Sequence, residues 1–206
     1  MISSSSINTM RFLQQENRKL REENEHLREQ VSRLLGYMDA LRKLQRTAAL
    51  ITAGEDVMPV LNQILYAGLT VTDSSAGSLL LRDPETDELV FAVVHGEQSR
   101  ALTGYRLPGD AGVAGWAATQ QRPIIVNDPR HDWRFTSEVD KEIGFETHNL
   151  IALPLIGRGR VLGVLEILNT FSGEDYTEAD LNLLNVLGLI AATVLDLLDT
   201  QGDESS

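Results

Sequence analysis

Leucine recurs at every seventh position across the first fifty residues of the chain. The repeat comprises Leu13, Leu20, Leu27, Leu34 and Leu41, and Ala48 continues its register. With these residues at the d positions of a heptad, the a positions are Met10, Asn17, Asn24, Val31, Met38 and Gln45. An apolar period of 3.5 residues over this length predicts a left-handed coiled coil over residues 10–50. The serine-rich residues 1–9 are predicted to be disordered.

The polar positions beside the leucines predict two parallel chains. Asn17 and Asn24 lie at a positions, where asparagines pair across a two-stranded interface and disfavour higher oligomers. The g and e positions carry Glu16 with Arg21 and Glu23 with Arg28. A parallel dimer sets each glutamate against a partner arginine, whereas an antiparallel dimer would set like charges together. The alternative is one amphipathic helix packed on its own domain, which would normally show a wider apolar stripe.

Beyond residue 50 the pattern changes to short strands and helices. Helices are predicted at 57–71, 112–120, 138–143 and 177–198, and strands at 76–81, 89–95, 123–126, 149–156 and 160–168. The last two strands flank the turn 157–159 and form a hairpin, and Thr177 opens the last helix with a capping-box pattern. This order predicts an α+β domain over 51–199, an antiparallel sheet with helices on one face and loops on the other, followed by a disordered tail at 200–206.

The last predicted helix is apolar on more than one side. One stripe comprises Leu184, Leu187, Ala191, Val194 and Leu198, and an adjoining stripe comprises Leu183, Val186, Ile190 and Leu197. The first stripe is expected to cover the sheet. The second needs another partner, most simply the terminal helices of a second subunit.

The charge and hydrophobicity of the chain limit the classes of function that are expected. The net charge is −12, and the acidic groups concentrate after residue 50, so the domain repels phosphate backbones and direct nucleic-acid binding is not expected. No apolar run approaches the roughly 20 residues that span a bilayer, and residues 1–10 lack the apolar core of a secretory signal. A cytoplasmic protein without a membrane segment is expected.

Five segments carry a family resemblance. They are 109–116 (GDAGVAGW), 124–129 (IIVNDP), 134–135 (RF), 144–155 (GFETHNLIALPL) and 163–169 (GVLEILN). In this order and spacing, the region from about residue 57 to 198 resembles a GAF domain, the sensory fold of cyclic-nucleotide phosphodiesterases, phytochromes and bacterial regulators. The resemblance implies a six-stranded antiparallel sheet with a ligand pocket on the face opposite the terminal helices.

The resemblance to cyclic-nucleotide-binding members also implies ligand-binding positions. They are Ser78, Asn127, Asp128, Lys141, Thr147 and Glu166. Those members carry an Asn-Lys, Phe, Asp-Glu signature, of which Asn169 and Asp180 remain here. Thr170, Tyr176 and Leu181 occupy the Lys, Phe and Glu positions, so the Lys-to-Asp pair of the family cannot form. A cyclic nucleotide therefore stays open as a ligand but loses support.

Other cofactors and enzymatic activity are disfavoured. The chain has no cysteine, which excludes a covalently attached bilin and the cysteine-dependent reduction of free methionine sulfoxide found in one branch of the resembled family. His95, His131 and His148 share no metal-ligand spacing, and haem held by His95 or His148 is disfavoured. Asp128, Asp132, Asp140 and Glu142 crowd one segment without a nucleophile motif, which is typical of a solvated loop.

The leading hypothesis is a non-catalytic, homodimeric sensor module. A small molecule binds in the GAF-type pocket, the change passes through the coiled coil, and a downstream signalling protein receives it. The alternative is a ligand-free GAF scaffold for dimerisation and protein docking.

Overall fold

The computed structural model describes residues 11, 13–24, 27–28, 31, 56–97 and 99–203. Two units divide the chain, residues 1–41 and 42–206. In the first unit every described residue is helical, and Arg18 bonds to Glu22 one turn along the helix with a 3.0 Å Nε–Oε1 distance. Its apolar side chains at a and d positions face solvent, and these are Leu13, Leu20, Leu27 and Val31. Residues 1–9, predicted to be disordered, lie outside the described residues, as do Met10, Leu34, Met38 and Leu41 of the predicted coil and residues 42–50 at its end.

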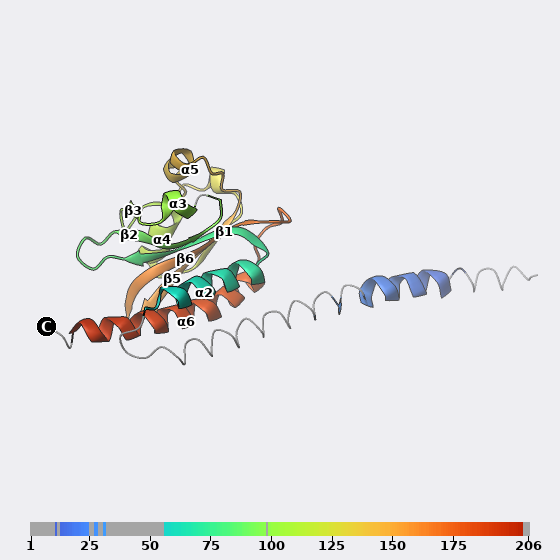
Figure 1. The fold of residues 1–206 in the computed structure, drawn as a ribbon. Helices are drawn as coiled ribbons and strands as arrows, with labels where there is room; N and C mark the ends of the chain where they lie inside the picture. The colour runs from blue at the N-terminus through green and yellow to red at the C-terminus, as the bar shows by residue number, and fades with distance from the viewer. Residues whose placement is uncertain are drawn as a thin grey trace, which may run out of the picture. The chain divides into compact units, whose positions relative to one another are not determined.

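The second unit is an α+β domain whose elements follow the predicted order with three additions (Figure 1). The elements are α2 (Met58–Val71), β1 (Ser74–Arg82), β2 (Leu89–His95), α3 (Ser99–Leu102), β3 (Arg106–Leu107), α4 (Gly112–Gln120), β4 (Ile124–Val126), η1 (Pro129–His131), α5 (Glu138–Ile143), β5 (Leu150–Gly157), β6 (Arg160–Thr170) and α6 (Glu178–Asp203). The additions are α3, β3 and η1, each four residues or shorter. They have too few positions to show a periodic pattern.

The six strands form one antiparallel sheet in the order β3-β2-β1-β6-β5-β4. The predicted hairpin joins β5 to β6 through a two-residue turn, in which Arg158 and Gly159 both have positive φ, 48° and 77°. Such turns match the twist of the flanking strands. The long β1 and β6 pair at the centre of the sheet, so residues on β6 are enclosed by strands on both sides.

Helices cover both faces of the sheet, which corrects the expectation of helices on one face. In Figure 1, α2 and α6 lie under the sheet while α3, α4 and α5 lie above it. The physical reason is visible in β5, where Leu150 to Leu155 are all buried. A strand that is apolar on both sides requires cover on both sides. Alternate residues therefore contribute to two apolar layers, one beneath α4 and the other against α2 and α6.

The last helix begins as predicted and ends later. Asp180 Oδ2 accepts hydrogen bonds from Thr177 N and Thr177 Oγ1, both 2.8 Å, so the capping box forms with aspartate in the glutamate position. The helix continues to Asp203, into the segment 200–206 predicted to be disordered, because no proline and no glycine precede Gly202 after the predicted end at Leu198. Residues 204–206 lie outside the described residues.

Length and composition alone would allow α6 to cross a membrane between Glu178 and Leu197. In this fold its first predicted stripe is buried against the sheet, and the described members of that stripe are Leu184, Leu187, Ala191 and Val194. The contact is close at Gly188, where an added Cβ would lie 2.4 Å from Leu153 Cδ2 of β5. Val186 and Leu189 on the outer side remain exposed. The helix is thus the cover of the lower face, with an apolar outer surface.

Candidate functional site

A cavity of about 100 Å³ opens on the face of the sheet opposite α2 and α6. Residues of β1, β2, β5 and β6 line it from the sheet, and α4, α5 and the loops beside them line it from above. The resemblance implied a pocket on this face. Gly112 allows α4 to begin at the cavity, because it has a φ of +67° that other residues rarely adopt.

A bulge in β2 shapes the floor of the cavity. Leu79 of β1 pairs with Val93 and Leu80 pairs with Phe91, so Ala92 is the extra residue. The bulge reverses the alternation of side chains, and Phe91 and Val94 both line the cavity although they are three residues apart. The strand thereby adds two apolar side chains to one face.

Glu166 lies in the middle of β6, on the floor of the cavity. It pairs with Ser78 of β1 on one side and Ala152 of β5 on the other. Ser78 Oγ donates a 3.2 Å hydrogen bond to Glu166 Oε2. Burial raises the pKa of the Glu166 carboxyl from 4.5 to about 7, the Ser78 bond opposes this rise, and the negative charge of Asp140 adds to it.

Asp140 of α5 also lines the cavity, and Thr147 holds its carboxylate in place. Thr147 N donates to Oδ2 at 2.9 Å and Thr147 Oγ1 donates to Oδ1 at 3.1 Å. The bonds join α5 to the segment that leads into β5. The cavity therefore has one carboxyl group on its floor and one on its α5 wall, and Glu97, after β2, is the third among its lining residues.

The structure brings three of the six predicted ligand-binding residues together at the cavity: Ser78, Thr147 and Glu166. Asn127, Asp128 and Lys141 are not among its lining residues. The Asn127 side chain instead binds the backbone of the segment before α6. It donates a hydrogen bond to Tyr176 O at 3.0 Å and accepts one from Tyr176 N at 2.9 Å. Asp128 pairs with His131 at the surface, and Lys141 is exposed on α5.

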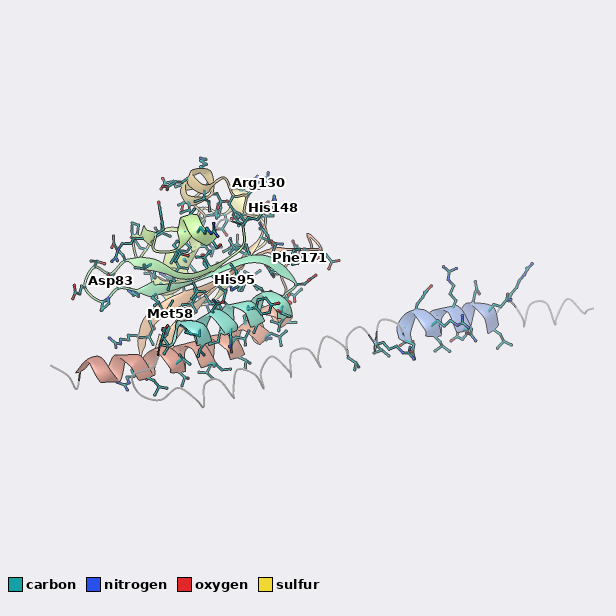
Figure 2. The ribbon with its side chains drawn as sticks, viewed as in Figure 1. Met58, Asp83, His95, Arg130, His148 and Phe171 are labelled. Atoms are coloured by element: carbon teal, nitrogen blue, oxygen red, sulfur yellow. The ribbon has the colours of Figure 1, made fainter. Side chains whose placement is uncertain are left out.

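Sequence reasoning did not assign Asp140 or the three lining phenylalanines to the pocket, and it considered His95 only as a haem ligand. Asp140 was read as part of a solvated acidic segment, yet its neighbours are engaged elsewhere: Asp132 pairs with Arg134, and Glu142 accepts from the Tyr105 hydroxyl at 2.8 Å. His95 lines the cavity while its Nε2 lies 2.7 Å from Asn62 Oδ1 of α2. His148, labelled in Figure 2, does not line the cavity and lies 3.8 Å from Glu146.

Thr170, Tyr176 and Leu181, which depart from the Asn-Lys, Phe, Asp-Glu signature, have other contacts within the domain. Asn149 Nδ2 donates to Thr170 Oγ1 at 3.3 Å, and Thr170 Oγ1 donates to Glu174 O at 2.7 Å. The Tyr176 hydroxyl is buried 2.7 Å from Ser74 Oγ. Leu181 is buried in the first turn of α6. The Lys-to-Asp pair of the resembled members is thus replaced by a neutral network and an apolar contact.

A family model described as "GAF domain" matches residues 55–196, which is more than half of the chain. The chain belongs to the GAF domain family. Over 93 residues it is 29% identical to the cone cGMP-specific 3',5'-cyclic phosphodiesterase subunit alpha' of Mus musculus, an alignment that covers 45% of this chain and 11% of that protein. The GAF domain thus corresponds to a small part of that relative.

Solved structures share the fold. The GAF domain of a phosphoenolpyruvate-protein phosphotransferase from Coxiella burnetii superposes with a TM-score of 0.71 at 19% identity, covering 82% of this chain and 98% of that one. The free methionine-R-sulfoxide reductase of Neisseria meningitidis, in complex with its substrate, gives 0.65 at 22% identity, covering 80% and 91%. A GAF domain is commonly a regulatory ligand-binding module, as in phosphodiesterases, and this fold also serves an enzyme.

Proposed function

We propose that this GAF protein is a non-catalytic sensor module that binds a small molecule in the cavity above the sheet. The observation that carries the proposal is the position of Glu166. An acidic group in the centre of a sheet costs stability unless it is paired, and among the described residues its one hydrogen-bond donor is Ser78. Such an arrangement is typical of a binding site.

The sheet offers a route from the cavity to the opposite face. Glu166 faces the cavity, whereas its neighbour Ile167 faces α2. A Cβ added to Gly68 of α2 would lie 3.1 Å from Ile167 Cδ1. Leu184 of α6 approaches the same position at 3.2 Å. Because this contact is tightly packed, a displacement of β6 on ligand binding would shift α2 and α6. We propose that this shift is the output of the sensor.

A thermal-shift screen of the full chain against nucleotides, oxo-acids and haem tests ligand binding. A ligand at 100 times its dissociation constant should add about 2.7 kcal/mol to the free energy of unfolding. If no compound in the panel raises the melting temperature by more than about 1 °C, the alternative gains support. That alternative is a ligand-free scaffold, and the structural partners of Thr170 and Tyr176 favour it.

We further propose that the chain is a parallel homodimer through its N-terminal helix. Leu13, Leu20 and Leu27 are each more than half exposed in the single chain, which leaves a row of leucines for a second copy to cover. The glutamates and arginines beside that row are complementary in the parallel orientation. The apolar outer side of α6, with Val186 and Leu189, and Tyr66 on α2 offer a second contact between subunits.

Light scattering on the full chain tests the dimer. Wild type should show twice the mass of one chain. Replacing both a-position asparagines, Asn17→Leu with Asn24→Leu, should give a changed or mixed oligomer. The matched control replaces the outward f positions, Gln15→Leu with Glu22→Leu, and should remain dimeric. A monomeric wild type would refute the proposal.

The location and the partners of the protein are also part of the proposed sensor function. The acidic domain is not expected to bind nucleic acid, and a cytoplasmic location and a downstream signalling partner follow from the proposed sensor role. Pull-down with the ligand-saturated and ligand-free full chain would identify that partner. A partner that distinguishes the two states supports a relay, and equal capture in both states argues against it.

A further inference from the structure

Carboxyl groups predominate among the ionisable side chains that line the cavity. Among the described residues that line it, the ionisable ones are His95, Glu97, Asp140 and Glu166, and neither lysine nor arginine occurs. The whole domain beyond residue 50 is acidic as well. A phosphate or carboxylate group entering this cavity would meet carboxyl groups without a side-chain cation to offset them. The ionisable residues that line the cavity therefore favour a ligand with positive charge and hydrogen-bond donors.

Two of these carboxyl groups, Glu166 and Asp140, are placed to receive such donors. Glu166 Oε2 accepts from Ser78, while Oε1 accepts no hydrogen bond from the described residues. Asp140 is held by Thr147 through both oxygens, which fixes its direction, and each carboxylate oxygen can accept a second bond. Asp140 is also near enough to raise the pKa of Glu166. A cation between the two groups would relieve this repulsion.

The rest of the cavity is apolar and aromatic. Phe91, Phe135 and Phe145 line it together with aliphatic side chains such as Val139 and Leu168. Aromatic faces attract organic cations and also cover apolar substituents. A cavity of about 150 Å³ holds one benzene, which has six heavy atoms, so the observed volume of about 100 Å³ suits a ligand of roughly four to six heavy atoms.

We propose that the cavity binds a small organic cation with an apolar body, such as an alkylammonium or amidinium, whose charged end contacts Glu166 and Asp140. This inference rests on the proposed ligand-binding function and names the chemical class of the ligand. It separates the chain from a cyclic-nucleotide receptor, since a cyclic phosphate is anionic.

Calorimetric titration and ¹H–¹⁵N spectra of the full chain at pH 8 test the inference with three matched probes. Isoamylammonium carries the cation, isoamyl alcohol has nearly the same shape without charge, and isovalerate carries an anion. The ammonium should bind at least about tenfold more tightly than the alcohol, the usual scale of a charge-assisted hydrogen bond. Isovalerate should not bind, and the shifted amides should lie in β1, β6 and the segment around α5.

Substitutions of the two carboxyl groups test which of them binds the ammonium group. Glu166→Gln should weaken isoamylammonium binding at least about tenfold, and Asp140→Asn should weaken it as a second, independent change. Glu146→Gln, an exposed glutamate outside the cavity, is the matched control and should leave the affinity unchanged. The same spectra report whether each variant is folded.

Three results would overturn the inference: no binding of the ammonium, equal affinity for the alcohol, or unchanged affinity in both cavity variants. Cyclic GMP and 2-oxoglutarate are titrated in parallel. If either anion binds while the ammonium does not, the cavity remains a ligand site and only the cationic class is wrong. If none of these probes binds and the wider screen is also negative, the ligand-binding function falls too.

Discussion

Replacing Glu166 with glutamine should remove a pH dependence from the stability of the domain. Glutamine has nearly the same shape, and its carbonyl oxygen can still accept the hydrogen bond from Ser78 Oγ. It cannot ionise, so the free energy of holding a carboxylate in the sheet disappears. At alkaline pH the variant should therefore be more stable than wild type, an unusual outcome for a substitution in the middle of a strand.

The sign and size follow from the pKa of Glu166, which rises from 4.5 to about 7 on folding. The folded protein binds this proton more tightly than the unfolded chain, so the contribution to stability is complete below pH 4.5 and is lost as pH rises through 7. Between pH 5 and pH 8.5 the loss amounts to about 2.5 kcal/mol. Asp140, His95 and Glu97 line the same cavity and are present in both wild type and variant, so the difference between the two proteins isolates Glu166.

Urea unfolding of the full chain at both pH values, at one protein concentration, measures the effect. The difference in unfolding free energy, variant minus wild type, should rise by about 2.5 kcal/mol from pH 5 to pH 8.5. Glu146→Gln changes the same chemistry at an exposed position and should show no such rise. A variant-minus-wild-type difference that stays constant with pH would refute the assignment of a raised pKa to Glu166.

Two further substitutions test the fold around the site. Asn127→Ala removes both hydrogen bonds to the backbone of Tyr176 and should lower the free energy of unfolding in urea by about 2 kcal/mol. Asp128→Ala, at the exposed neighbouring position, should change it by less than about 0.5 kcal/mol. Equal effects of the two substitutions would show that the hydrogen bonds of Asn127 do not stabilise the fold. Gly163→Ala would place its Cβ 2.2 Å from Leu80 O in the neighbouring strand, so we expect a loss of about 3 kcal/mol, and an unchanged melting temperature would contradict this register.

The elements that the sequence predicted well are those with a long local pattern. The hairpin of β5 and β6 has two apolar runs around a turn that contains Gly159, a residue that readily adopts positive φ, and β2 was predicted with its observed bounds, Leu89–His95. The two-residue β3 depends on pairing with β2, which no local pattern encodes. The second helical layer was also missed, although the unbroken burial of β5 implies cover on both faces.

For the site, the predicted residues that line the cavity are Ser78 and Glu166 in regular strands and Thr147 in the segment before β5, whereas residues that depend on the bulge or on the orientation of α5 were missed. Ser78 and Glu166 line the cavity because they pair across β1 and β6. Phe91 and Val94 reach it together only through the bulge at Ala92, which the residue pattern did not reveal. Asp140 was grouped with exposed carboxylates, because sequence alone does not show which face of the six-residue α5 points to the cavity.

Two polar groups of this domain, the Tyr176 hydroxyl and the Glu166 carboxyl, have pKa values raised by burial, and the contrast between them separates structure from function. The Tyr176 hydroxyl belongs to a closed chain: it contacts Ser74, Ser74 contacts Thr72 at 2.8 Å, and Thr72 donates to Gly68 O at 2.8 Å. That network satisfies its members, and none of them lines the cavity described above. Within the described part of the chain Glu166 has one donor, the Ser78 hydroxyl, and it faces the cavity that Asp140 also lines. Because folding alone gains nothing from an acid in that position, a ligand that brings donors or positive charge is the simplest reason for its presence.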